Sequence, residues 1–227
     1  MSVDFVAGEY WTPERTRDSA SRMAESFASP EMQSLMSQIA KGAAENGNPA
    51  ALAAALASDG PLHTGATTPV AAAACRYRRS RPSDLAELTR LIIHGDLPPM
   101  FIEEFIEGFV AVEHDGEIVG CGGLELYGDS GVIRSVVVDE RGRGQRIGEH
   151  MTELLMADAR SAGLLHLYLF TMHAHEFWLR HGFTDVPLEA WEEPPRVSWQ
   201  YQFVSQFPQA SSNIYSMWRA AGEPERA

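Results

Sequence analysis

Apolar positions between residues 109 and 138 recur with the short period of β-strands and are interrupted by turn sequences. The turns lie at His114-Asp115-Gly116 and around Gly128-Asp129, so this stretch is predicted to form three strands. Three further strands are predicted at residues 76–82, 164–170 and 211–219.

Helical periods occur between these strands. Ser83-Asp84 opens a helix, with apolar residues at helical spacing at Leu85, Leu88, Leu91 and Ile92. Helices are also predicted over residues 98–108, after Gly148 and through residues 175–183. Strands and helices mixed in this way predict an α/β (α+β) domain at residues 76–227.

Residues 1–60 differ from the rest of the chain in their sequence pattern and are predicted to form a helical extension. Thr12-Pro13-Glu14, Ser29-Pro30-Glu31 and Asn48-Pro49 each place a capping residue before a proline suited to the first helical position. No catalytic constellation is visible there, so packing or homo-oligomerisation is favoured over a role as a substrate lid. Residues 61–75 read as a linker.

Composition narrows the classes of partner. The 227 residues carry a formal net charge of −13, which argues against a nucleic acid as the main partner. Arg76, Arg78, Arg79 and Arg81 are therefore read as a solvated strand face rather than a nucleic-acid site. No run approaches the ~18 apolar residues of a membrane span, and no secretory signal is visible. With only two cysteines, Cys75 and Cys121, a reducing cytoplasm fits best.

The stretch ERGRGQRIGEHM, residues 140–151, holds three glycines and three arginines directly after a predicted strand. Ile147, Met151, Leu154 and Leu155 then form one apolar helix face, so the stretch is a strand-to-helix turn. The amides at a helix N-terminus bind phosphate, and glycine lets the backbone approach it closely. The turn matches neither G-x-x-x-x-G-K-[ST] nor G-x-G-x-x-G. An arginine-rich solvated turn is the alternative.

Arg143-Gly144-Gln145-Arg146-Ile147-Gly148 resembles the [QR]-x-x-G-x-[GA] signature of the GNAT superfamily of N-acetyltransferases. Arg146 stands where glycine is usual, and an arginine there can still offer its amide if its φ is negative. AHEFWLRHGF, residues 174–183, resembles the superfamily's second CoA-contacting helix. The segment 123–138 is most similar to arsenic-resistance-associated acetyltransferases, and next to the short N-acetylglutamate synthases.

This resemblance implies a mixed central sheet flanked by helices, with acetyl-CoA as cosubstrate and a small, amino-acid-like amine as acceptor. It also implies that the backbone of Val136 to Val138 pairs with the pantetheine arm. Trp178 stands where many members carry a tyrosine that protonates the leaving thiolate, which indole cannot do. The CoA-binding residues implied are Val136, Val138, Arg143, Gly144, Gln145, Arg146, Ile147, Gly148 and Trp178.

The acceptor amine must lose a proton before it attacks, and Glu125 is the candidate base. The alternative for Glu125 is a solvated strand carboxylate. Arg134 interrupts an apolar strand and needs an anion, either Glu125 or a carboxylate of the acceptor. His173 is expected nearest the acceptor. Glutamate is a doubtful acceptor, because the two basic residues that hold it in the synthases align with His173 and approximately with Ser211.

No metal site is predicted, because His175 and His181 are six residues apart and no cysteine or aspartate completes a set with His173 and Glu176.

The function expected from the resemblance is acetyl transfer from acetyl-CoA to a small amine. The alternative is an acyl-CoA-binding regulatory or assembly module with little turnover, acting through the N-terminal helices.

Overall fold

The computed structural model describes residues 2–4, 21, 23–25, 27–46, 74–209 and 211–222. Its sheet has the order β1-β2-β3-β4-β5-β6-β8-β7. The strands are β1 Ser2–Val3, β2 Arg76–Arg79, β3 Phe109–His114, β4 Glu117–Tyr127, β5 Ser130–Val138, β6 His166–Thr171, β7 Thr184–Asp185 and β8 Tyr215–Ala220. Neighbouring strands run antiparallel except for β1 with β2 and β5 with β6. The prediction of a mixed central sheet is confirmed.

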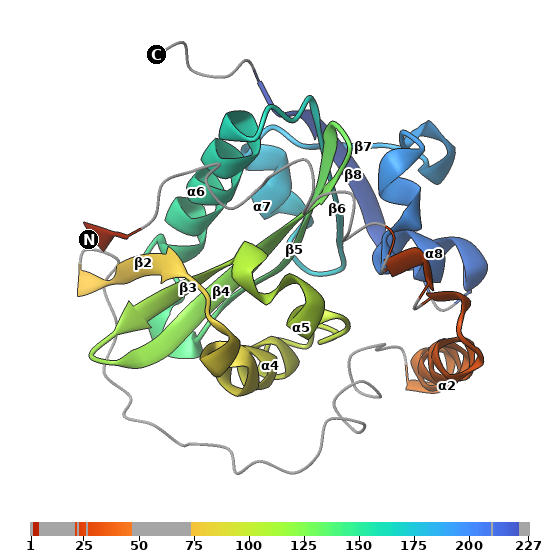
Figure 1. Cartoon of the computed structure of the whole chain (residues 1–227), viewed down its shortest axis with the longest axis horizontal. Coiled ribbons are helices and arrows are strands. Elements are labelled where there is room, and N and C mark those ends of the chain that lie inside the picture. Colours follow the sequence, from red (N-terminus) through yellow and green to blue (C-terminus); the bar gives the residue numbers. More distant parts are fainter. Residues whose placement is uncertain are drawn as a thin grey trace.

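Helices flank this sheet, as predicted (Figure 1). They are α2 Pro30–Asn46, α4 Leu85–His94, α5 Ile102–Phe105, α6 Ile147–Ser161, α7 His175–Arg180 and α8 Trp199–Gln206. Single 3-10 turns lie at Pro82–Asp84, Ile106–Gly108, Glu140–Gly142, Leu188–Ala190 and Pro194–Val197. Helix α8 was not predicted from the sequence.

The β3–β4–β5 meander forms where the apolar pattern predicts it. Asp115 and Gly116 have φ values of 50° and 83°, and two consecutive positive φ angles suit the tight turn of a two-residue hairpin. On β4, a Cβ at Gly122 would lie 3.1 Å from Leu155 of α6, and one at Gly123 would lie 2.7 Å from the Phe109 ring. Glycine at these two positions lets a helix and an aromatic ring pack directly on the strand.

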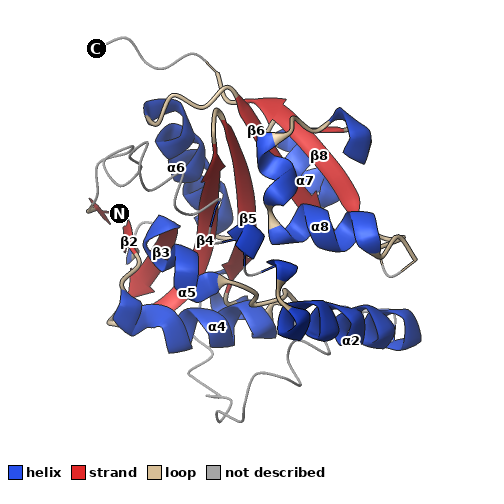
Figure 2. Cartoon of the chain, turned by 45° about the vertical axis from the view of Figure 1, so that its right-hand side comes forward, coloured by secondary structure: helices blue, strands red, loops and turns tan. Residues whose placement is uncertain are grey.

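The N-terminal segment packs onto the sheet domain. Helix α2 begins as predicted, with the Ser29 hydroxyl accepting a hydrogen bond from the Met32 amide at 3.2 Å. Its buried residues Met36 and Ile39 belong to the main hydrophobic core. Two views place α2 beneath α8 (Figures 1 and 2). The apolar face of α2 is thus covered by the same chain.

Two other contacts join the segment to the domain. The Phe27 ring stacks on Phe101 with 6.5 Å between ring centroids, and β1 extends the sheet by pairing with β2. The expected helix starts at Thr12 and Asn48 lie outside the described residues, as does most of the expected linker. The domain boundaries at residues 60 and 75 therefore stay predictions.

The arginine-rich strand β2 corrects one expectation. Arg76 is exposed, but Arg78 is buried and its guanidinium contacts Asp84 at 2.6 Å and Glu113 at 2.7 Å. Burial of an arginine requires such partners, since an unpaired charge in the core is strongly unfavourable. The reading of all four arginines as a solvated face is wrong for Arg78.

Candidate functional site

The site lies where the two central parallel strands separate. Strands β5 and β6 pair only from Ser130 to Val132 on β5, against residues 166–168 on β6. Beyond Val132, β5 keeps its partner β4 but has no strand on the β6 side within the described residues. An unpaired strand edge offers its N–H and C=O groups to a ligand. The gap between the strands opens a cleft lined by residues 133–138 and 170–174.

An irregularity of β5 lies at the mouth of this gap. The β4–β5 register shifts between Cys121 and Gly123, and Ser135 opposite has a φ of 52°. A bulge of this kind leaves an extra residue outside the ladder and redirects neighbouring groups. It turns the strand between Arg134 and Val137, within the stretch that lines the cleft.

The turn from β5 to α6 is the glycine- and arginine-rich stretch. Gly144 has a φ of 74°, and no atom lies within 4 Å of the position a Cβ would occupy. Helix α6 begins at Ile147, and its first backbone bond runs from the His150 amide to the Arg146 carbonyl at 3.1 Å. The amides of Ile147, Gly148 and Glu149 are therefore helix N-terminal donors, which together with the helix dipole favour an anion. The predicted strand-to-helix turn is confirmed.

Arg146 does not have the negative φ that was expected to let an arginine offer its amide at this position. Its φ is 63°, in the left-handed region that glycine favours and arginine avoids. Its exposed guanidinium pairs with Glu149, and this contact holds the pKa of the Glu149 carboxyl below its usual value. The side chain of Arg146 is thus engaged on the outer surface of α6, while its backbone adopts the conformation of the glycine it replaces.

A groove leads from this turn along the cleft. One wall carries Val136, Val138, Arg143 and Gly148, and the other consists of residues 172–178 with Arg180 and Tyr215. Arg143 is exposed, and its Nε lies 3.4 Å from the Val138 carbonyl oxygen. Trp178 is buried and packs edge-on against Phe177 and Phe183 at 5.0 and 5.3 Å between ring centroids. The groove has the cationic turn at one end and this aromatic cluster on its floor.

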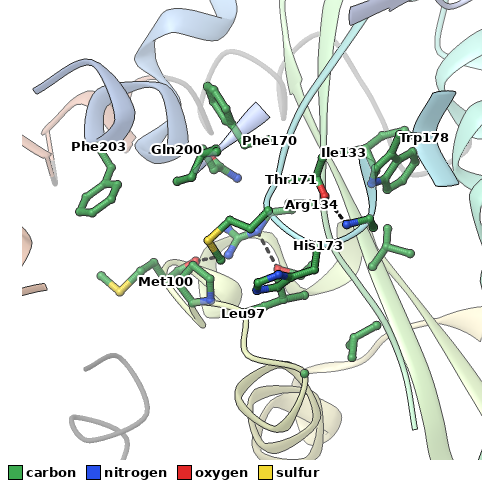
Figure 3. A pocket seen from close by; sticks show the side chains of 18 of the residues that line it. Leu97, Met100, Ile133, Arg134, Phe170, Thr171, His173, Trp178, Gln200 and Phe203 are labelled. Atoms are coloured by element: carbon green, nitrogen blue, oxygen red, sulfur yellow. Dashed lines mark hydrogen bonds between the residues drawn. The ribbon is translucent and has the colours of Figure 1, made fainter. Parts of the chain in front are cut away.

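The deep end of the cleft is a cavity of about 300 Å³. Its wall is mainly apolar and comes from six separate parts of the chain (Figure 3). Its lining includes Ile39, Leu97, Met100, Ile133, Phe170, Trp199, Gln200, Phe203 and Ile214. We call this cavity the deep half and the groove beside the glycine-rich turn the outer half. Both are lined by Val136, Val138, Arg143, His173 and Trp178.

Arg134 lines the deep half, and each nitrogen of its guanidinium already donates a hydrogen bond within the protein. Its Nη1 lies 2.7 Å from Glu125, its Nη2 donates to the Met100 carbonyl at 2.5 Å, and its Nε lies 3.3 Å from Ser135 Oγ. The guanidinium also lies 5.3 Å from the centre of the Trp199 ring. Of the two anions expected for Arg134, the structure shows Glu125.

Glu125 does not line either half of the cleft. It is 0% exposed, and it accepts hydrogen bonds from Arg134 and from the Tyr127 hydroxyl at 2.8 Å. Burial, together with the adjacent carboxylate, raises the pKa of Tyr127, so that phenol stays a donor. The reading of Glu125 as a solvated carboxylate is wrong. Its role as the base stays a prediction, and its burial away from the cavity argues against that role.

His173 lies at the junction of the two halves. Thr171 Oγ1 accepts the Ala174 amide at 3.1 Å, which closes the turn after β6 and exposes His173 into the cleft. Among the residues that line the deep half, the other ionisable groups are the guanidiniums of Arg134 and Arg143. A guanidinium group stays protonated in proteins and cannot accept a proton, whereas a neutral imidazole can. Among the ionisable side chains that line the deep half, His173 is thus the one that can accept a proton.

The described residues hold no arrangement suited to a metal ion and no helix suited to a membrane. No group of three or more His, Cys, Asp and Glu side chains is arranged to hold a metal ion there. His175 instead contacts Asp185 at 2.8 Å and stacks on Tyr215, and His181 caps the end of α7. No helix in the same ranges is long and apolar enough to cross a membrane.

The sequence did not reveal two parts of this site. The first is α8, whose residues Trp199, Gln200 and Phe203 form one wall of the deep half. The second is Ile39, which brings the N-terminal segment into the lining. Neither carries a motif, because both are defined by packing between segments far apart in the chain.

Comparison with known proteins gives a consistent picture. A model of the acetyltransferase (GNAT) family matches residues 76–183. The chain is 33% identical over 126 residues to the amino-acid acetyltransferase of Mycobacterium tuberculosis, which covers 49% of this chain and 71% of that protein. It is 30% identical over 153 residues to the amino-acid acetyltransferase of Ralstonia nicotianae, covering 62% of this chain and 34% of that protein. The chain thus spans about a third of the longer relative.

Solved structures share the fold. The N-acetylglutamate synthase of Neisseria gonorrhoeae, complexed with coenzyme A and N-acetyl-glutamate, superposes with a TM-score of 0.56 at 20% identity, over 66% of this chain and 35% of that one. Rv2747 of Mycobacterium tuberculosis, in complex with CoA and NLQ, superposes with a TM-score of 0.53 at 25% identity, over 63% of this chain and 98% of that one.

Proposed function

Because this chain belongs to the acetyltransferase (GNAT) family, we propose that it transfers the acetyl group of acetyl-CoA to the amine of an amino-acid acceptor. The observation that carries the proposal is the cleft, which runs from the N-terminus of helix α6 to a mainly apolar cavity along an unpaired strand edge. The names of the curated relatives support an amino acid as acceptor.

The fit to acetyl-CoA follows from the groups on each side of the outer half. The pyrophosphate would lie on the turn from Arg143 to Gly148, where the open position at Gly144 lets oxygen atoms reach the amides. The pantetheine amides would pair with the free edge of β5 at Val136 and Val138. Gln145 and Ile147 would contribute to the binding of acetyl-CoA through the backbone of the turn. Trp178 would contribute through the floor of the groove.

The reaction proposed is direct attack within the cleft. The neutral amine nitrogen attacks the thioester carbonyl carbon and the C–N bond forms. The C–S bond then breaks, CoA leaves as the thiolate, and the nitrogen releases its extra proton to solvent or to that thiolate. A free amine has a pKa of about 8 to 10 and is mostly protonated at neutral pH, so a base must take its proton. We assign that proton to His173, because Glu125 has both carboxylate oxygens engaged inside the core.

Positioning supplies most of the rate in such a mechanism. Holding amine and thioester side by side replaces an encounter in solution by a reaction within one complex. The α-carboxylate of the acceptor would accept hydrogen bonds from the N–H groups of Arg134 that are not engaged by Glu125 and Met100. The leaving thiolate needs no protonated partner, which is why Trp178 is compatible with turnover.

The proposal also concerns the chemical class of the acceptor, the cellular compartment and the oligomeric state. The similarity of residues 123–138 to arsenic-resistance-associated acetyltransferases makes arsenic- and phosphorus-containing amino acids worth testing. Action in the cytoplasm is proposed from the two-cysteine composition. Assembly into a homo-oligomer is less favoured than before, because α2 uses its apolar face within the chain.

The test is release of free thiol from acetyl-CoA with a panel of L-amino acids, polyamines, aminoglycosides and phosphinic or arsenic amino acids. Turnover with an amino acid is expected, and His173→Asn should lower kcat/KM by about 10²-fold or more, as expected for the loss of a general base. Binding of acetyl-CoA without turnover on any acceptor would instead support the regulatory module.

A further inference from the structure

Ser135 has a backbone conformation that serine disfavours, at the bulge of β5. Its φ of 52° lies in the left-handed region, where glycine is unstrained and asparagine and aspartate are the commonest other residues. A strained residue of this kind persists only where the surrounding structure enforces it, and such residues cluster at active sites. A serine at this position supplies a hydroxyl group, which glycine would not.

The Ser135 side chain lies at the surface of the deep half. Ser135 is half-buried, and it lines this cavity but not the outer half. Its carbonyl oxygen is turned toward β4, where Cys121 Sγ lies 3.9 Å away. Of the two oxygens of Ser135, the hydroxyl is therefore the one left to face the cavity.

Arg134 prepares this hydroxyl to act as a hydrogen-bond donor. Arg134 Nε donates to Ser135 Oγ at 3.3 Å, so the hydroxyl hydrogen has to point away from the guanidinium. Among the described residues, no group accepts that hydrogen. The guanidinium is itself held by the Met100 carbonyl at 2.5 Å (Figure 3). A hydroxyl that accepts a bond from a cation becomes a stronger donor, because linked hydrogen bonds polarise one another.

The position of Ser135 along β5 brings this donor to the expected place of the thioester. In the proposed function the pyrophosphate lies on the turn after β5, and the pantetheine arm follows the strand edge at Val138 and Val136. In the direction away from the turn, Ser135 is the next residue of β5 after Val136. The thioester ends the pantetheine arm, so its carbonyl group would lie beyond Val136 and next to Ser135.

We infer that Ser135 is a catalytic residue, whose hydroxyl donates a hydrogen bond to the thioester carbonyl oxygen. The inference rests on the proposed function, because it takes the acetyl group of acetyl-CoA as the group transferred. As the amine attacks the carbonyl carbon, negative charge grows on this oxygen, and a fixed donor stabilises that charge more than it stabilises the ground state. The serine keeps its proton throughout, and the C=O double bond forms again when the C–S bond breaks.

The kinetic experiment uses two variants that lack the hydroxyl and differ in backbone strain. The kcat of Ser135→Ala should fall by about 10²-fold, as for the loss of one donor to an oxyanion, while KM for the amino acid changes little. Ser135→Gly should lose as much activity but melt at a higher temperature than Ser135→Ala, because glycine tolerates the φ of 52°. Ser161→Ala, at the exposed end of α6, is the control and should change neither kcat nor Tm.

A binding experiment tests the same contact without turnover. The ligand is the ketone analogue of acetyl-CoA, in which CH₂ replaces the thioester sulfur, and the reference is CoA, which has no acetyl carbonyl. In calorimetry the Kd of the ketone should be about 3- to 10-fold higher for Ser135→Ala than for the wild-type chain, the size of one net hydrogen bond. The Kd of CoA should be the same for both chains, whereas a variant with a disturbed fold would bind both ligands more weakly.

Three results would overturn the inference. A Ser135→Ala variant with unchanged kcat and an unchanged Kd for the ketone would refute it and leave acetyl transfer in place. Activity restored in Ser135→Gly would assign the loss to the backbone conformation and not to the hydroxyl. Failure of the wild-type chain to turn over any acceptor would refute the inference together with the proposed function.

Discussion

The two halves of the cleft are built in different ways. In the outer half, the part proposed to bind the pyrophosphate is one continuous stretch, residues 138–148, of which Arg143 to Arg146 are exposed. The deep half gathers residue 39, the 95–100 loop, β5, the end of β6, α8 and Ile214, and most of these side chains are buried or half-buried. A phosphate is bound by backbone geometry, which a local motif can specify. A particular acceptor requires a shaped wall, which only the packed fold can provide.

The largest expected effect belongs to the deep half. Arg134→Ala leaves Glu125 buried without its cation, so the free energy of unfolding should fall by about 3–5 kcal/mol. Urea denaturation followed by tryptophan fluorescence measures it. Arg143→Ala removes an exposed arginine from the same cleft and should change stability by no more than about 0.5 kcal/mol. Equal losses in the two variants would contradict the contrast between the halves.

The next effect concerns the wall that the N-terminal segment supplies. Ile39 is 3% exposed, so Ile39→Ala should cost about 2–4 kcal/mol of stability by leaving a cavity. The KM for the acceptor should rise, and the Kd of acetyl-CoA should stay constant, because Ile39 lines only the deep half. Ser34→Ala, on the exposed side of α2, is the control. A changed Kd for acetyl-CoA would show that α2 acts on the whole cleft.

The outer half should respond in affinity rather than in stability. Gly144→Glu introduces a carboxylate where the pyrophosphate is proposed to lie, so the Kd of acetyl-CoA in calorimetry should rise by about 10- to 100-fold, or about 1.4–2.8 kcal/mol. Gly144→Ala shares the unfavourable φ of 74° but carries no charge, and it meets no atom within 4 Å. An alanine variant as defective as the glutamate variant would assign the loss to the backbone.

The same contrast explains what could be predicted from the sequence. The meander and α6 follow from apolar periods and from turn residues such as Asp115-Gly116, which act over a few positions. The strand β4 is buried on both faces after Glu117, so its pattern cannot reveal that Glu125 points into the core. For Gln200 no local signal exists, because the burial of its side chain is a property of the packed fold. Helix α8 is short and weakly periodic, and its wall becomes visible only in three dimensions.

The smallest expected effect lies where the turn departs from the family signature. Arg146 has a left-handed φ that glycine adopts without strain, so Arg146→Gly should raise the Tm by about 2–4 °C. The backbone amide remains, so the Kd of acetyl-CoA should change by less than about tenfold, with a weaker dependence on salt because one cation is lost.

The ion pair with Glu149 gives this last prediction an independent readout. In the native chain Arg146 lowers the pKa of Glu149, so the pair stabilises the fold above the ordinary carboxyl pKa. That contribution is lost as the pH falls through the lowered pKa. In Arg146→Gly the pKa of Glu149, followed by NMR, should return toward its usual value, and this part of the acid dependence of stability should disappear. A rise in Tm with unchanged affinity would mean that arginine is tolerated in the turn, whereas a large loss of affinity would mean that its side chain contacts the phosphates.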